Sequence, residues 1–124
     1  MVWDYTCRDT LCQSNVAGTS EEAGKAAQQA ETTKMTTYRE LTMNYSVIPV
    51  AMETLGSWGP TGLKFIKDIG ARISEATGEK KAKYYLFQAI SIAVQRGNVA
   101  SVLGTTPDTR KLDEIFYFLG EQFQ

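Results

Sequence analysis

The chain has 124 residues, of which 43% are hydrophobic and 22% are charged, and its formal net charge is −1. This composition is typical of one compact globular domain and argues against a disordered chain and against a broadly basic nucleic-acid binder. Histidine is absent, and the two cysteines are Cys7 and Cys12. A zinc site of cysteine and histidine ligands and a catalytic cysteine–histidine pair are therefore excluded.

The N-terminal segment predicts a short strand, a loop and the start of a long helix. β-Branched and aromatic residues around one acid predict a strand from Val2 to Thr6, and the polar residues 8–18 predict a loop. Thr19 and Glu22 have the spacing of a capping box, and alanines recur after them at three- and four-residue intervals. A helix that can approach a sheet closely is therefore expected to begin here.

This helix is expected to extend to about Met43, and the segment after it predicts a second strand. Three residues continue its apolar stripe: Met35, Tyr38 and Leu41. The nearly continuous apolar run within residues 45–53 predicts a strand that is covered on both faces. Because proline lacks a backbone donor, this strand is predicted to lie at a sheet edge or to be interrupted at Pro49.

The C-terminal half of the chain predicts helices only. Pro60 suits the first turn of a helix that ends at Gly78. Another helix is predicted over residues 80–95, with helical structure again over residues 99–103, and a final amphipathic helix over residues 112–123. A strand, a crossover helix and a second strand predict parallel pairing, so the fold class is α/β with an all-helical C-terminal extension.

Other sequence features bear on localisation. No segment approaches the roughly 20 apolar residues that span a bilayer, and no signal peptide is recognisable at the N-terminus. Two cysteines do not make a disulfide framework. These features predict an intracellular protein, nuclear or cytoplasmic, that makes no membrane contact.

Three residues of the predicted strand-helix unit point to phosphodiester chemistry. Asp4 lies in the middle of the first strand, and Lys34 and Tyr38 are four residues apart on the helix, so they share one face. We expect the crossover to bring the three side chains together, with Asp4 as a Mg²⁺ ligand, Lys34 stabilising phosphate charge and Tyr38 bonding to either. A second carboxylate is missing. The alternative is that Asp4 is a solvent-facing strand acid and Lys34 a solvated helix lysine.

Several other residues are further candidates, and some of them have two interpretations. Glu53 ends the second strand, where it faces a metal or, in the favoured alternative, caps the following helix. Arg96 and Asn98 are candidate DNA contacts, although an arginine before Gly97 is equally typical of a helix end. Trp58 is interpreted as a packing anchor in a tight turn.

Four blocks of this sequence resemble one protein family in the same order. They are residues 3–11 (WDYTCRDTL), 23–41 (AGKAAQQAETTKMTTYREL), 49–60 (PVAMETLGSWGP) and 90–98 (ISIAVQRGN). They look like segments of the restriction-like endonuclease domain at the C-terminus of non-LTR retrotransposon, or reverse transcriptase, polyproteins. The resemblance extends over most of the chain to about residue 104, and four ordered blocks are more specific than any single one.

The resemblance implies a PD-(D/E)xK nuclease core and Mg²⁺-dependent cleavage of DNA. Asp4 matches the metal-binding acid of the central strand, Lys34 the catalytic lysine that lies on the helix, and Tyr38 its companion. The family's first acid, in a Pro-Asp pair upstream of the central strand, has no counterpart, and Asn15 stands where the family usually has histidine. The chain is therefore expected to be an N-terminally truncated domain that is inactive on its own.

Together these observations predict a partial restriction-endonuclease-like core over residues 1–60 and a helical extension over residues 61–124 that packs on it as one compact domain. The expected function is that of a remnant DNA endonuclease domain. Two alternatives remain: a non-catalytic DNA-contacting or helical protein-interaction module, and a structural protein that forms homo-oligomers through its C-terminal helix.

Overall fold

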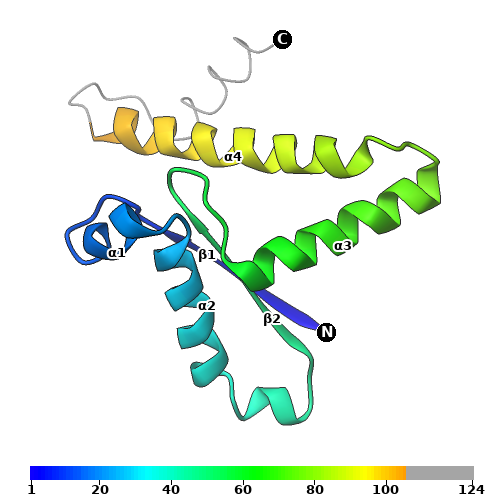
Figure 1. Cartoon of the computed structure of the whole chain (residues 1–124), viewed down its shortest axis with the longest axis horizontal. Helices are drawn as coiled ribbons and strands as arrows, with labels where there is room; N and C mark the ends of the chain where they lie inside the picture. Colours follow the sequence, from blue (N-terminus) through cyan, green and yellow to red (C-terminus); the bar gives the residue numbers. More distant parts are fainter. Residues whose placement is uncertain (106–124) are drawn as a thin grey trace. The chain divides into compact units, whose positions relative to one another are not determined.

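The computed structural model describes residues 1–105 (Figure 1). The elements in chain order are β1 (Val2–Arg8), α1 (Val16–Glu21), α2 (Lys25–Thr37), the short 3-10 helix η1 (Leu41–Met43), β2 (Val47–Glu53), α3 (Pro60–Thr77) and α4 (Ala82–Gly104). The fold class is α/β, as predicted: two parallel strands with helices between them, followed by two long helices. The final helix predicted over residues 112–123 lies outside the described residues.

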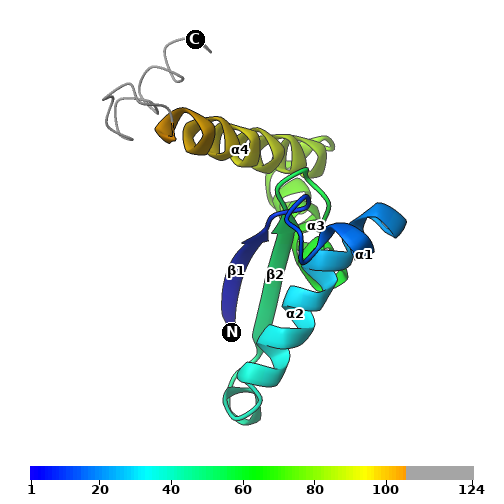
Figure 2. The same cartoon turned by 90° about the vertical axis from the view of Figure 1, so that its left-hand side faces the viewer.

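The chain divides into two compact units, which are described separately. The first extends from Met1 to Phe87 and the second begins at Gln88. The first unit holds both strands and the helices from α1 to α3. Within it, α2 packs on both strands and α3 packs on β2 (Figure 2). The predicted division between residues 60 and 61 stays a prediction.

The sheet consists of β1 and β2, which pair in parallel along their whole lengths. At the two ends of the ladder, the Val2 amide donates to the Ser46 carbonyl and the Thr54 amide donates to the Arg8 carbonyl. Because the backbone groups of a strand alternate in direction, the even-numbered residues of β1 bond to β2. The odd-numbered residues of β1 direct their amides and carbonyls to the opposite edge.

Pro49 fits into β2 because the position of its missing amide hydrogen faces away from β1. In this register the odd-numbered residues of β2 face its outer edge, where the Ala51 carbonyl accepts from the Gly59 amide and the Glu53 amide donates to Ser57. Of the two predicted alternatives, the edge position is confirmed, and the strand continues through the proline. The predicted burial on both faces also holds, since β2 is buried from Pro49 onward.

Helix α2 begins later than its sequence pattern predicts. The capping box at Thr19 is wrong, because Thr19 lies inside α1 and its hydroxyl bonds to backbone carbonyls. The loop predicted over residues 8–18 likewise contains the start of α1. The backbone leaves the helical conformation between α1 and α2, and Gly24, the residue before α2, has a φ of 85°. Glycine has no side chain with which to cap the helix.

The inner face of α2 is formed by small residues, as predicted. Ala27 and Ala30 form a buried cluster with Ala51 of β2, and side chains of this size let the helix backbone come close to the sheet. The predicted extension of the helix is wrong in part. Helix α2 ends at Thr37, and its expected apolar stripe fails at two positions, which are exposed: Met35 and Leu41.

Helix α3 begins and ends where the sequence predicts. Pro60 occupies its first turn and Gly78, with a φ of 74°, follows its last residue. Helix α4 differs from the prediction, because it continues without a break through Gly97. A helix stop at that glycine is therefore wrong. No helix within residues 1–105 is both long enough and apolar enough to cross a membrane.

Candidate functional site

The structure brings Asp4, Lys34 and Tyr38 together. The Lys34 ammonium lies 2.7 Å from Oδ2 of Asp4, and the Tyr38 hydroxyl donates to the same oxygen at 3.1 Å. The ammonium also lies 5.6 Å from the centre of the Tyr38 ring, within the range of a cation–π contact. The side chains of Asp4 and Lys34 are each 32% exposed. The convergence predicted from helical spacing and the crossover is thus observed at the surface of the first unit.

The backbone of two elements places these groups. Asp4 is an even-numbered residue of β1, and its side chain is on the face of the sheet that α2 covers. Lys34 lies in the last turn of α2, and Tyr38 is its C-cap residue, whose amide donates to the Lys34 carbonyl. A cation in the last turn also interacts favourably with the helix dipole. The cluster therefore forms where the C-terminal end of α2 meets the middle of β1.

The three groups shift each other's protonation. The hydrogen bond from Lys34 lowers the pKa of the Asp4 carboxyl, the bond from Tyr38 lowers it further, and partial burial opposes both effects. The same bond to Asp4 raises the pKa of the Lys34 amine. Both groups are therefore charged across the neutral range, and their charges compensate. Lys34 is held as an ammonium, so it is a cation or hydrogen-bond donor and not a proton acceptor.

The described residues do not form a complete magnesium site. Mg²⁺ prefers near-octahedral oxygen coordination and is usually held by one or two carboxylates together with substrate oxygens. Residues 1–105 contain no group of three or more potential metal-binding acids or thiols. Asp4 is the only acid in the cluster, and one of its oxygens already accepts from both Lys34 and Tyr38. The donor set that the resemblance implies is therefore incomplete in this part of the chain.

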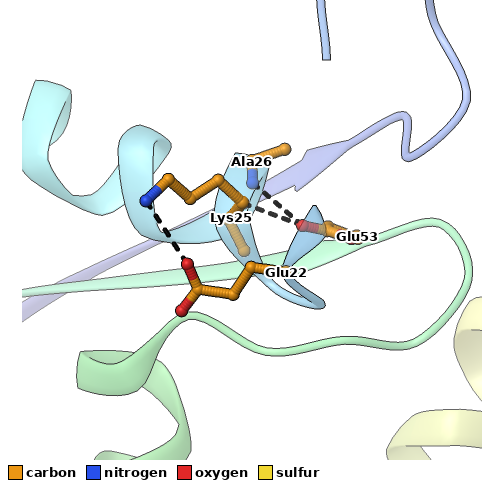
Figure 3. Close-up of polar contacts among 5 residues, drawn as sticks. Glu22, Lys25, Ala26 and Glu53 are labelled. Carbon is orange, nitrogen blue, oxygen red and sulfur yellow. Dashed lines mark hydrogen bonds and ion pairs between the residues drawn. The ribbon is translucent and has the colours of Figure 1, made fainter. Parts of the chain in front are cut away.

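Glu53 has a different role from either that the sequence suggests. It is fully buried, and its Oε1 accepts from the Ala26 amide at 2.9 Å (Figure 3). The same oxygen accepts from the Ala27 amide at 3.4 Å. It therefore caps α2, the helix before it, so the predicted cap of the following helix is wrong. Asp4 pairs with Pro49 of β2, and Glu53 is four residues further along that strand. At the rise of a strand the separation is roughly 13 Å, so Glu53 does not belong to the Asp4 cluster.

Glu31 is a buried acid that the sequence analysis missed. Its Oε2 accepts from the Thr61 amide at 2.9 Å and its Oε1 from the Gly62 amide at 2.7 Å, so it caps the N-terminus of α3. The signal in the sequence is an acid in line with the small inward residues of α2, one position after Ala30. A charge on a buried face requires partners, and amides at a helix start supply them.

The remaining candidates lie elsewhere. Arg96 and Asn98 belong to α4 in the second unit, and Asn98 donates to the Gln95 side chain; their contact with DNA stays a prediction. Trp58 makes an edge-to-face contact with Phe87, with ring centres 5.7 Å apart, which agrees with its interpretation as a packing anchor. Cys7 and Cys12 are free thiols.

Comparison of the chain with protein families, with curated proteins and with solved structures finds no match.

Proposed function

We propose that this chain is a remnant of a metal-dependent DNA endonuclease domain of the non-LTR retrotransposon type, which contacts DNA phosphates but does not cut DNA on its own. The observation that carries the proposal is the junction of Asp4, Lys34 and Tyr38 on one carboxylate oxygen. These are the three residues that the family resemblance matches to a metal-binding acid, a catalytic lysine and its companion tyrosine. An intracellular protein, nuclear or cytoplasmic, fits this function.

The chemistry of the cluster supports phosphate contact. Lys34 has three donor hydrogens, of which the bond to Asp4 uses one, and its side chain is partly exposed. A further hydrogen can be donated to a phosphate oxygen that approaches from solvent. The Tyr38 ring lies near the ammonium, and the Tyr38 hydroxyl donates to the same Asp4 oxygen that pairs with it. Such a contact positions a nucleic-acid backbone and carries no sequence information.

The same cluster argues against cleavage by this chain alone. Its one carboxylate is neutralised by Lys34, and the described residues offer no second acid beside it. We therefore favour a non-catalytic DNA-contacting module for the chain as it stands. With a net charge of −1, its affinity for DNA is expected to be weak and to depend strongly on salt.

The proposal is tested by DNA binding and by cleavage. Binding of the whole chain to duplex DNA is measured by fluorescence anisotropy over a series of salt concentrations, for the natural sequence and for Lys34→Ala. We expect the substitution to weaken binding several-fold and to reduce the salt slope by about one, the value for one phosphate contact. Lys25→Ala is the matched control, because Lys25 is on the same helix and pairs with Glu22, away from Asp4.

Plasmid nicking in Mg²⁺ is measured in parallel, and no nicking is expected. Nicking that disappears in both Asp4→Ala and Lys34→Ala would show that the domain is an active nuclease and would overturn the non-catalytic part of the proposal. If DNA binding is absent, or is equal in Lys34→Ala and the natural sequence, the phosphate-contacting role is wrong.

A further inference from the structure

We propose that the open edge of β1 pairs antiparallel with β1 of a second copy of this chain, in a register that places Asp4 of each copy opposite Arg8 of the other. The result is a four-stranded sheet with β1 strands at its centre. The proposal concerns a surface of the first unit and does not depend on the proposed function.

The two edges of the sheet differ in how many of their backbone amides and carbonyls have hydrogen-bond partners. The outer edge of β2 is partly covered by the segment that follows it: Met52 bridges to Trp58, and the Gly59 amide donates to Ala51. β1 has no such cover, and Figure 2 shows it at the margin of the unit with no other described element on its outer side. Its odd-numbered residues therefore present unpaired amides and carbonyls, which are a template for another strand.

The side chains along this edge are unusually apolar for a surface. Trp3 is 59% exposed and Tyr5 is 45% exposed. Both are odd-numbered residues of β1, so their side chains lie on the face of the sheet opposite to α2. On that face α3 packs on β2 and leaves β1 uncovered. α2 and α3 stabilise the two-stranded sheet but leave this apolar face of β1 exposed, and an added strand would bury it. Pairing of two copies joins both sets of aromatic side chains into one strip.

Charge selects the register of this pairing. Hydrogen bonds through the odd-numbered residues restrict an antiparallel pair to registers that differ by two residues. A pair centred on Thr6 places each Asp4 opposite an Arg8 of the other copy, which is favourable. Lys34 and Tyr38 both bond to Oδ2 of Asp4, so Oδ1 is left to accept from that arginine. A pair centred on Asp4 places two carboxylates opposite each other, and a pair centred on Tyr5 leaves both charges without a partner across the interface. Arg8 has no ion-pair partner within residues 1–105.

A charge exchange tests this arrangement. Self-association of the whole chain is measured by analytical ultracentrifugation over a range of concentrations, and a dimer is expected for the natural sequence. Arg8→Glu places a glutamate opposite Asp4, and Asp4→Lys places a lysine opposite Arg8, so each variant alone should dimerise at least about tenfold more weakly. An equal mixture of the two variants restores both opposite-charge pairs and should recover dimerisation. Arg72→Glu, on α3, is the control for the charge change.

Cross-linking tests the register without changing a charge. With Cys7→Ser and Cys12→Ser as background, Thr6→Cys puts two thiols opposite each other at the two-fold axis, at a non-hydrogen-bonded position with Cβ atoms about 4.5–5.5 Å apart. Copper phenanthroline should join these chains, and should join chains with Tyr5→Cys in the same background much less.

Three results would overturn the proposal. The first is a natural chain that stays monomeric throughout, in which case another chain or segment covers the edge. The second is a dimer that neither Arg8→Glu nor the mixture affects. The third is cross-linking at position 5 in preference to position 6. Circular dichroism identifies variants that fail to fold, and the cross-linking result stands if Asp4→Lys is one of them.

Discussion

The two ends of helix α2 use a carboxylate in opposite ways. At the N-terminal end, Glu53 is fully buried and its partners are backbone amides. At the C-terminal end, Asp4 is partly exposed, and its partners are the side chains of Lys34 and Tyr38. Both acids lie on the same face of the sheet. The comparison shows that an acid on a strand is a candidate for chemistry only when solvent or substrate can reach it and when its partners are side chains that can move.

The largest expected effect concerns Glu31, which belongs to the buried class. Glu31→Ala leaves two amides of α3 without an acceptor in a buried place, and bonds to a charged group contribute about 1.5–3 kcal/mol each. We expect the free energy of unfolding to fall by about 3 kcal/mol, measured by urea denaturation. Glu75→Ala, at an exposed position of α3, should change the free energy of unfolding little. Equal losses in the two variants would contradict the capping role.

A smaller loss is expected for Glu53→Ala. The substitution removes the cap of α2, but it also removes Oε2, a buried oxygen that has no hydrogen-bond partner among the described atoms. The penalty for burying that oxygen offsets part of the loss, so unfolding should become easier by about 2 kcal/mol. Glu22→Ala, at the exposed ion pair near the same helix end, is the control in the same denaturation experiment. A loss larger than that for Glu31→Ala would mean that the unpartnered oxygen costs little.

Tyr38→Phe should have a still smaller effect on stability. It removes one partly exposed hydrogen bond to Asp4 and keeps the ring beneath Lys34, so the expected loss is about 0.5–1 kcal/mol. Both this variant and its control, Tyr45→Phe at an exposed tyrosine, are measured by urea denaturation, and the control should be neutral. A loss as large as that for Glu31→Ala would mean that the Tyr38 hydroxyl makes a buried hydrogen bond like those of Glu31 and Glu53.

The smallest expected effect is the pH dependence of stability that comes from the partly exposed cluster of Asp4, Lys34 and Tyr38. The pKa of Asp4 is lowered in the folded chain, so its stabilisation is present above the unfolded pKa of about 3.9 and is lost as pH falls through the lower folded value. The pKa of Lys34 is raised, so its stabilisation is present below about 10.4 and is lost as pH rises through the higher folded value.

Asp4→Asn should remove both of these losses. The stability difference between the natural chain and the variant is expected to be constant between about pH 5 and 9 and to shrink at both extremes. Denaturation curves at a series of pH values measure it. A difference that stays constant to pH 2 would mean that Asp4 is not paired in the folded chain.

The sequence predicts the elements that local pattern determines and misses the contacts that depend on the fold. The strands, their parallel pairing and the start of α3 follow from apolar runs and from Pro60. Helical spacing also predicts that Lys34 and Tyr38 share a face, and the crossover predicts that they meet Asp4. The true start of α2 was missed because its cap comes from Glu53, 27 residues away.

The same reason explains the missed role of Glu31. Its partners are the amides of Thr61 and Gly62, and nothing near Glu31 in the sequence indicates them. Gly59 confirms how closely the two segments fit, because a Cβ at that position would meet the Glu31 carboxylate, with Oε2 at 2.8 Å. The short segment Trp58-Gly59-Pro60 therefore combines a packing anchor, space for an acid and a helix start.

The two buried glutamates have a consequence for how the chain folds. Glu53 connects the end of β2 to α2 across 27 residues, and Glu31 connects α2 to α3 across 30 residues. The second and third amides of each helix have these glutamates as acceptors and are not satisfied until the distant segment arrives. Contacts of this sequence separation are slow to form. The first unit should therefore acquire its helices and its sheet in a single cooperative step, and a peptide limited to α2 or to α3 should remain largely unstructured in water.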